Sequence, residues 1–200
     1  MRNCVLVRHW ITKGNTKKRY TGRSDEHILV ADPQVVSSIR DSITSHLTDN
    51  FCIITGPMTR CLETASLLFP EHDTKTSEEL TEIDFGLFEG KTHEELEDDP
   101  EYAAWLNGGW KTAIPGGERL DDFMRRSMEG FKKALELADG RDCVIVCHGG
   151  NIMSVMSTLT KGEYYDFRPG NLEGYALSVE EDDKRIRVVS YDRIGCGDSN

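Results

Sequence analysis

Two histidines, His9 and His148, stand at the ends of short apolar runs of the chain. The stretches that they end, residues 5–9 and 144–148, each read as a buried strand that delivers a polar group to its C-terminal end. Ligands of open α/β sheets lie outside the carboxyl ends of the strands. A single histidine in such a place is usually structural, but one of these follows Arg8 and the other precedes two glycines. The pair favours a site in which imidazole takes part in chemistry.

Arginines and helix starts beside both histidines favour a phosphoryl group as the ligand. Arg60 and Gly149 fall at the predicted N-termini of helices, where free N–H groups and the helix dipole attract anions. The planar guanidinium groups of Arg8 and Arg60 match the oxygens of phosphate. In such a pocket one histidine can form a phosphohistidine, and the other can hydrogen-bond the oxygens of the transferring group. These residues therefore predict phosphoryl transfer.

Hydrolysis of a phosphate ester also needs a carboxyl group, which protonates the leaving oxygen and later activates water. The stretch 78–89 holds the candidates. They are Glu78, Glu79, Glu82, Asp84 and Glu89. The residue pattern alone does not choose among them.

The alternation of strand and helix patterns predicts the scaffold that must position these groups, an α/β sandwich with a largely parallel sheet. Strands are expected at 3–9, 51–55 and 143–148, with a weak edge strand at 74–79 and a closing hairpin of 174–180 with 185–191. Helices are expected at 32–46, at 59–68 with Thr59 as N-cap, at 118–138 and near 150–160. Short helices are expected after Thr92 and from Pro100.

Residues 10–31 are predicted to form a long polar loop with five basic residues in an acidic chain. These are Lys13, Lys17, Lys18, Arg19 and Arg23. The loop is either a solvated segment or a rim that attracts an anion, and the sequence leaves both readings open.

The length and composition of the chain limit which classes of protein and which partners are compatible with it. The 200 residues suit one domain, 1–200, in which 70–120 is expected to be a cap-like insertion over the site. The net charge of −11 disfavours nucleic acid and anionic membranes as partners. No apolar run reaches the roughly 18 residues of a membrane span, and the N-terminus does not read as a secretory signal.

The six cysteines suggest reduced thiols and a cytoplasmic location. No C-x-x-C pair occurs. Strand alternation would point Cys147 and His148 to opposite faces of the sheet, which disfavours a metal site there. A monomer and a homodimer are both compatible with the sequence.

Four segments in sequential order carry a family resemblance: LVRHWITKGN, GPMTRCLETA, LTEIDFGLFEG and VCHGG. Together they resemble the motifs of the histidine phosphatase superfamily, in its phosphoglycerate-mutase-like branch, over nearly the whole chain. The segment PGGE at 115–118 is similar to the small phosphatases of that family. The resemblance implies a three-layer α/β/α sandwich with a mostly parallel central sheet.

The same resemblance implies roles for individual residues. His9 would be the nucleophile and Glu82 the acid and base, with Arg8, Arg60 and His148 completing the catalytic set. The implied substrate- and phosphate-binding residues are Arg8, Asn15, Thr21, Gly22, Arg60, Glu82, His148 and Gly149. No metal and no organic cofactor is implied.

The implied activity is a phosphomonoesterase acting on a small-molecule phosphate ester, and the chain looks most like the alpha-ribazole phosphatases and related small phosphatases. Alpha-ribazole 5′-phosphate and a sugar phosphate are the candidate substrates, and a phosphoglycerate mutase is the alternative within the class. One departure motivates a third reading. Trp10 stands where the family has glycine, so an indole could crowd the pocket, swing outward or stack on a substrate ring. In the first case the protein would bind a phospholigand without turnover.

Overall fold

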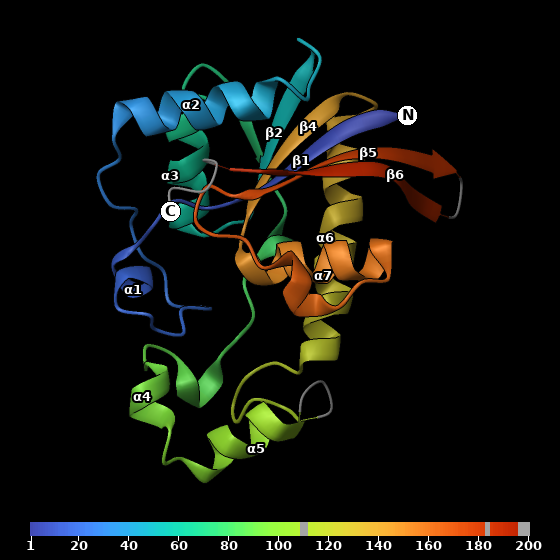
Figure 1. The fold of residues 1–200 in the computed structure, drawn as a ribbon. Coiled ribbons are helices and arrows are strands. Elements are labelled where there is room, and N and C mark those ends of the chain that lie inside the picture. The colour runs from blue at the N-terminus through green and yellow to red at the C-terminus, as the bar shows by residue number, and fades with distance from the viewer. Residues whose placement is uncertain (109–111, 183–184, 196–200) are drawn as a thin grey trace.

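A mixed sheet forms the centre of the molecule in the computed structural model, which describes residues 1–108, 112–182 and 185–195 (Figure 1). Within these residues six strands lie in the order β3-β2-β4-β1-β5-β6. Their bounds are β1 Arg2–Arg8, β2 Phe51–Thr55, β3 Thr74–Thr76, β4 Asp142–Cys147, β5 Gly174–Asp182 and β6 Arg185–Ile194. The first four in the sheet order pair in parallel, and β5 and β6 form the predicted antiparallel hairpin at one edge. The predicted mostly parallel sheet is confirmed.

Helices cover both faces of the sheet. On one face lie α2 (Pro33–Thr44) and α3 (Thr59–Leu68), and on the other lie α6 (Leu120–Ala138) and α7 (Gly149–Thr160) (Figure 1). The alternation of strand side chains produces the two cores. Val5 and Val7 of β1 pack toward α2 and α3, whereas Leu6 between them packs toward α6 and α7. The three-layer α/β/α architecture is therefore confirmed.

The start of α3 differs from the sequence prediction. Met58 is the N-cap, and it makes no side-chain capping bond, so the assignment of Thr59 as N-cap is wrong. The missing acceptor comes from the 10–31 segment. The Asp25 carboxylate accepts hydrogen bonds from the Thr59 backbone N–H at 3.0 Å and from its hydroxyl at 2.6 Å. This cap ties the long loop to the helix that carries Arg60.

The 10–31 segment is not an uninterrupted loop. It contains a one-turn helix, α1 (Lys13–Thr16), which has a capping box between Thr12 and Asn15. Gly14 within it leaves room for the Glu26 carboxylate, since a side chain at that position would meet it at 2.6 Å. The segment is thus folded against the body of the protein, and it presents Asn15 in a fixed orientation.

The segment between β3 and α6 holds only short elements in its described part. They are η1 (Glu78–Leu80), η2 (Gly86–Phe88), α4 (His93–Leu96) and α5 (Pro100–Gly108). The predicted capping box at Thr92 is confirmed. The elements η2, α4 and α5 share a separate apolar cluster in which Phe88, Tyr102 and Ile114 pack with Phe123 of α6. In Figure 1 α4 and α5 lie at the opposite end of the molecule from α2.

A last short element, η4 (Tyr164–Phe167), links α7 to β5. Within the described ranges no helix combines the length and the apolar character that crossing a membrane requires. The five described cysteines are free and buried, as expected for thiols that act as small core residues.

Candidate active site

A cleft of about 590 Å³ opens at the carboxyl ends of β1 and β4. Its floor contains Arg8, His9, Asn15, Glu82 and Gly149. Parallel strands deliver their end residues to one edge of a sheet, so two predicted strand ends meet here although about 140 residues separate them. The cleft therefore gathers most of the predicted site residues.

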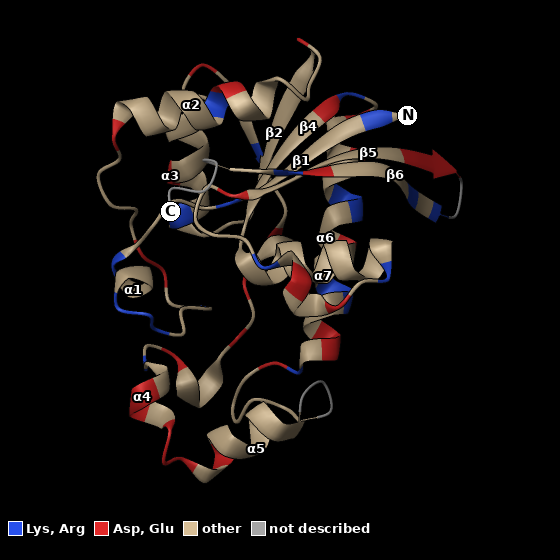
Figure 2. Ribbon diagram, viewed as in Figure 1, with Lys and Arg blue, Asp and Glu red and all other residues tan. Residues whose placement is uncertain are grey.

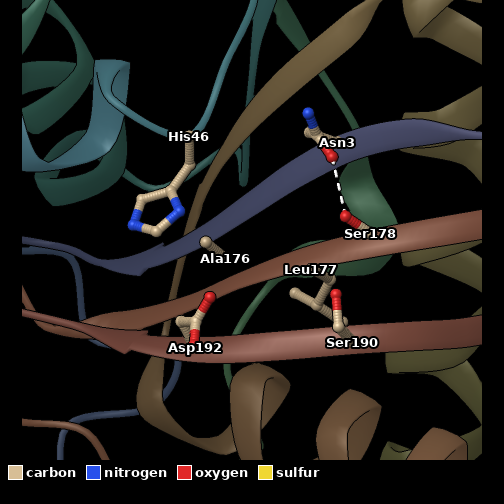
Figure 3. A pocket seen from close by; sticks show the side chains of 7 residues that line it. All are labelled: Asn3, His46, Ala176, Leu177, Ser178, Ser190 and Asp192. Carbon is tan, nitrogen blue, oxygen red and sulfur yellow. Dashed lines mark hydrogen bonds between the residues drawn. The ribbon is translucent and has the colours of Figure 1, made fainter.

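A second hollow, between β1, β5 and His46, is too small to be a ligand site (Figure 3). It measures about 30 Å³, room for about one water molecule. Ser178 donates a hydrogen bond to the Asn3 side chain across its wall at 2.9 Å. The large cleft is the better candidate for binding.

His9 is held in the form that a nucleophile requires. Its Nδ1 lies 2.7 Å from the carbonyl oxygen of Trp10, which can only accept, so Nδ1 carries the proton and Nε2 has the lone pair. The side chain is 4% exposed. Burial, together with the charges of Arg60 and Arg8, lowers the pKa of His9 to about 3. The ring is therefore neutral near neutral pH.

Arg8 offers an unused hydrogen-bond donor beside His9. Its Nη1 donates to the carbonyl of Pro169 at 3.0 Å, whereas its Nε is buried with no partner among the described residues. Gly149, the first residue of α7, lies beside this guanidinium, and even an added Cβ would make only an ordinary 3.6 Å contact with Nε. A buried, unsatisfied cationic donor beside a helix N-terminus fits an anion.

Glu82 faces the same cleft from the segment before η2. Its two oxygens accept hydrogen bonds from the backbone N–H groups of Ile83, at 2.9 Å, and Gly150, at 3.2 Å. Gly150 permits this approach, since a Cβ there would lie 2.3 Å from the carboxylate. Burial raises the pKa of Glu82, against the opposing effect of these N–H groups and of the nearby arginines. A raised pKa suits a carboxyl group that must deliver a proton.

Arg60 and His148 lie behind the wall of the cleft rather than on its surface. The Arg60 guanidinium donates from Nη1 to Ser24 O and from Nη2 to Gly22 O, both at 2.7 Å, and from Nε to His148 Nδ1 at 3.2 Å. The His9 and His148 rings are 5.2 Å apart in an edge-to-face arrangement. Burial and the Arg60 charge hold the pKa of His148 well below its usual value. The predicted residues thus form two layers.

The remaining predicted residues play different parts. Asn15 lines the cleft, and Asn171 fixes it by donating from Nδ2 to both Asn15 Oδ1 (3.3 Å) and the His9 carbonyl (2.9 Å). Thr21 also lines the cleft. Gly22 does not, because its N–H is bound by Glu89 and its carbonyl by Arg60. Its place suits a role in supporting Arg60.

Trp10 lies outside the cleft. Its backbone N–H donates to the Thr64 hydroxyl at 2.8 Å, and its indole packs on the apolar cluster of the α2 and α3 face. The chain therefore turns the side chain outward at the point where the family glycine would stand. This position agrees neither with crowding of the pocket nor with stacking on a substrate ring. The presence of Trp10 therefore no longer favours a noncatalytic binder.

Several lining residues were not found by sequence reasoning. They are Tyr20, Phe85, His93, Trp105, Tyr164, Tyr165, Arg168 and Asn171, among others. Arg168 and Asn171 belong to the loop before β5. That strand pairs antiparallel with β1, so its start lies beside the end of β1. This strand pairing brings the loop to the site, and the pairing cannot be predicted from any local pattern in the sequence.

Comparisons with known proteins agree with this geometry. A model of the histidine phosphatase superfamily (branch 1) matches residues 4–192. A probable phosphoglycerate mutase of Yersinia enterocolitica is 28% identical over 165 residues, which cover 80% of this chain and 75% of the relative. The chain therefore belongs to the histidine phosphatase superfamily, branch 1.

Solved structures share the fold at low sequence identity. The alpha-ribazole phosphatase of Shigella flexneri has a TM-score of 0.75 and 23% identity, covering 99% of this chain and 100% of that one. A phosphoserine phosphatase of Entamoeba histolytica, solved with 3-phosphoglyceric acid, has a TM-score of 0.78 and 22% identity, covering 96% of this chain and 97% of that one. Family members are phosphatases and mutases, so membership supports an enzyme that handles phosphate esters.

Proposed function

We propose that the protein is a cofactor-independent phosphomonoesterase that hydrolyses a small-molecule phosphate ester through a phosphohistidine at His9. The observation that carries the proposal is the hydrogen bond of His9 Nδ1 to Trp10 O. It leaves Nε2 unprotonated in the cleft, next to the unpaired Nε of Arg8. A neutral imidazole beside a free cationic donor is what attack on a phosphate dianion requires.

In the first step His9 Nε2 attacks phosphorus and the P–O bond to the leaving group breaks. Glu82 in its protonated form, which its raised pKa favours, delivers its proton to the leaving oxygen. In the second step the Glu82 carboxylate takes a proton from water, whose oxygen attacks phosphorus as the P–N bond breaks. Arg8 and the N-terminus of α7 hold the phosphoryl oxygens, while Arg60 and His148 stabilise them from behind.

The candidate substrates are alpha-ribazole 5′-phosphate and sugar phosphates. The aromatic side chains of Tyr20, Phe85 and Trp105 in the cleft wall support an organic group larger than a simple alkyl chain. We also propose that the segment 70–120 acts as a cap within one domain, since it supplies these last two residues. A mutase differs only in that a second hydroxyl, instead of water, accepts the phosphoryl group.

Trapping of the covalent intermediate tests the proposal. Wild type incubated with a ³²P-labelled aryl phosphate and quenched in alkali should retain label in an acid-labile form, and His9→Ala should retain none. His27→Ala is the matched control, because His27 is an exposed histidine paired with Glu63. Inorganic phosphate should appear in step with the alcohol. Transfer of the label to a second hydroxyl would instead favour the mutase, and normal turnover by His9→Ala would exclude the covalent mechanism.

A further inference from the structure

The residues that line the cleft are mainly basic among those that carry charge, whereas the chain as a whole is acidic. The protein as a whole has 35 acidic and 24 basic residues. Of the described residues that line the cleft, however, Glu82 is the only acidic one, and four are basic: Arg8, Lys18, Arg19 and Arg168. Figure 2 shows basic residues along the loop that follows α1, whereas α4 and the turn before α5 are mostly acidic. Basic residues thus outnumber acidic ones at the cleft, in contrast to the chain as a whole.

These rim cations form no close ion pair among the described residues, although Lys18 interacts at longer range with Glu94. No ion pair joins Lys18, Arg19 or Arg168 to an acidic residue within the described part of the chain. Arg19 does donate from Nη1 to the Gly90 carbonyl at 2.6 Å, which holds it toward the cap. Lys18 and Arg168 have no hydrogen bond from their charged groups to any described residue. They are the cations free to meet a ligand.

The Arg168 backbone is held firmly beside the phosphate floor. Directly after it the loop is bonded to the end of β1: the Pro169 carbonyl accepts from Arg8 Nη1, and the Leu172 N–H donates to Arg8 O at 3.1 Å. Asn171 adds its bond to the His9 carbonyl. Arg8 and Arg168 line the same cleft. Burial lowers the pKa of Arg8, and the Arg168 charge acts in the same direction.

A phosphoryl group does not need these outer charges. Arg8, the N-terminus of α7 and the Arg60–His148 pair behind it already supply donors and positive charge at the floor. Gathering exposed cations around one cleft without close ion-pair partners is electrostatically unfavourable, and it becomes favourable when an anion binds between them. The positive charge beyond what one phosphoryl group needs therefore points to a second negative group on the ligand.

We propose, on the basis of the proposed function, that Arg168 and Lys18 form a subsite for a second anionic group of the substrate, a carboxylate or a further phosphate. The preferred substrates are then phosphate monoesters with two anionic groups. A neutral sugar or ribazole ester would leave the subsite empty.

Matched substrate pairs test this subsite. 3-Phosphoglycerate and glycerol 3-phosphate differ only by a carboxylate in place of a hydroxymethyl group. Fructose 1,6-bisphosphate and fructose 6-phosphate differ by a phosphate. The wild type should show at least about tenfold higher kcat/KM for the doubly anionic member of one pair, because a charged hydrogen bond is worth that much. The pair that shows the preference identifies the second group as carboxylate or phosphate.

Arg168→Gln and Lys18→Gln should each reduce that preference several-fold, with the greater loss on the doubly anionic ester. Lys17→Gln is the control, because it removes the same charge one residue away and Lys17 does not line the cleft. Equal kcat/KM for both members of both pairs in the wild type would overturn the subsite. So would an Arg168→Gln variant that loses activity equally on both members.

Binding to His9→Ala, measured by calorimetry, separates this inference from the proposed function. If the same preference in Kd is present there and is lost in the His9→Ala, Arg168→Gln double variant, the subsite exists whether or not the wild type hydrolyses esters. If the wild type turns over aryl phosphates but binds the two members of each pair equally, the subsite is wrong and the phosphatase stands.

Discussion

The chemistry of individual residues depends here on what holds their polar atoms. In the proposed mechanism the reactivity of His9 and Glu82 depends on backbone partners: a carbonyl that accepts a hydrogen bond from the histidine Nδ1–H, and two N–H groups that donate to the carboxyl. Burial lowers the pKa of His9 to about 3 and raises the pKa of Glu82, so it favours the neutral form of both groups.

Glu82→Gln should affect esters with poor leaving groups far more than activated aryl esters, because the lost function is protonation of the leaving oxygen. We expect a loss on the order of 100-fold or more in kcat/KM for alkyl phosphates and a much smaller loss for p-nitrophenyl phosphate. In the wild type kcat/KM for alkyl phosphates should fall as the pH rises through the Glu82 pKa, since the acid form is consumed. A leaving-group series measured on both proteins checks this. Equal losses across the series would move the acid role to another residue.

Trp10→Gly should lower stability rather than change substrate preference. The indole contributes to the apolar cluster between the sheet and α2 and α3, and a large aromatic side chain removed from such a place costs roughly 2–4 kcal/mol of unfolding free energy. Denaturant unfolding gives that number. The ratio of kcat/KM for an aryl ester to that for a sugar phosphate should stay within about twofold, because the ring does not contact the cleft. A marked fall of that ratio would place the indole against the substrate.

At the scale of elements, the site depends on a loop clamped from two sides. Glu89, just after η2, accepts hydrogen bonds from the backbone N–H groups of Gly22 and Arg23 and from the Ser24 hydroxyl, at 2.7 to 3.2 Å. The carbonyls of Gly22 and Ser24 in turn hold Arg60. A carboxylate from the segment before α4 and α5 thus sets the position of a guanidinium that lies behind the wall of the cleft.

Glu89→Gln should therefore weaken the hold on Arg60. An amide keeps the shape but accepts less strongly than a carboxylate, so the Arg60 charge should withdraw in part from the histidines, and the low pKa of His9 should rise. NMR titration of His9 measures this shift, and kcat should fall together with it.

Glu118→Gln is the control for that variant, because Glu118 is a similarly placed carboxylate that binds Arg126 at 2.7 Å and makes no contact with the loop at 22–24. A purely structural role for Glu89 would lower stability in both variants and leave the His9 titration unchanged.

The molecule as a whole carries a stability cost for burying its active-site histidines. The unfolded chain binds protons at these residues near pH 6.5, whereas in the folded protein the pKa of His9 is about 3 and the pKa of His148 lies well below its usual value. Because the unfolded state then binds more protons, stability is complete above about pH 6.5 and falls as the pH decreases toward 3. Glu82 acts in the opposite sense, since its raised pKa favours the folded state at low pH.

His9→Asn should flatten this acid dependence. Each buried histidine contributes a slope of up to about 1.4 kcal/mol per pH unit, so the free energy of unfolding, measured with urea at pH 7, 6, 5 and 4, should decline less steeply in the variant. His27→Asn should not flatten it, because Glu63 raises the pKa of that exposed histidine. Parallel curves for wild type and His9→Asn would mean that His9 is protonated normally in the folded protein.

Local sequence patterns were sufficient to predict most helices and strands and the types of residue at the floor of the cleft. Apolar runs of five to seven residues predicted β1, β2 and β4, and helical spacing predicted α2, α3 and α6. These predictions were possible because the spacing of apolar residues within a segment reflects which of its side chains a strand or helix buries. The order of motifs placed Arg8, His9, Asn15 and Glu82, all of which line the cleft. The hydrogen bonds that cap the start of α3 at Thr59 were missed because their acceptor, Asp25, is distant in the sequence.

Only the tertiary structure decided which groups reach the surface of the site. The loop carrying Arg168 arrives because β5 pairs with β1, the indole of Trp10 turns away because an apolar surface lies behind it, and Arg60 is drawn inward by carbonyls of a folded loop. Each of these outcomes depends on contacts between residues tens or more than a hundred positions apart. Such contacts arise from packing, whose partners no local spacing of residue types specifies.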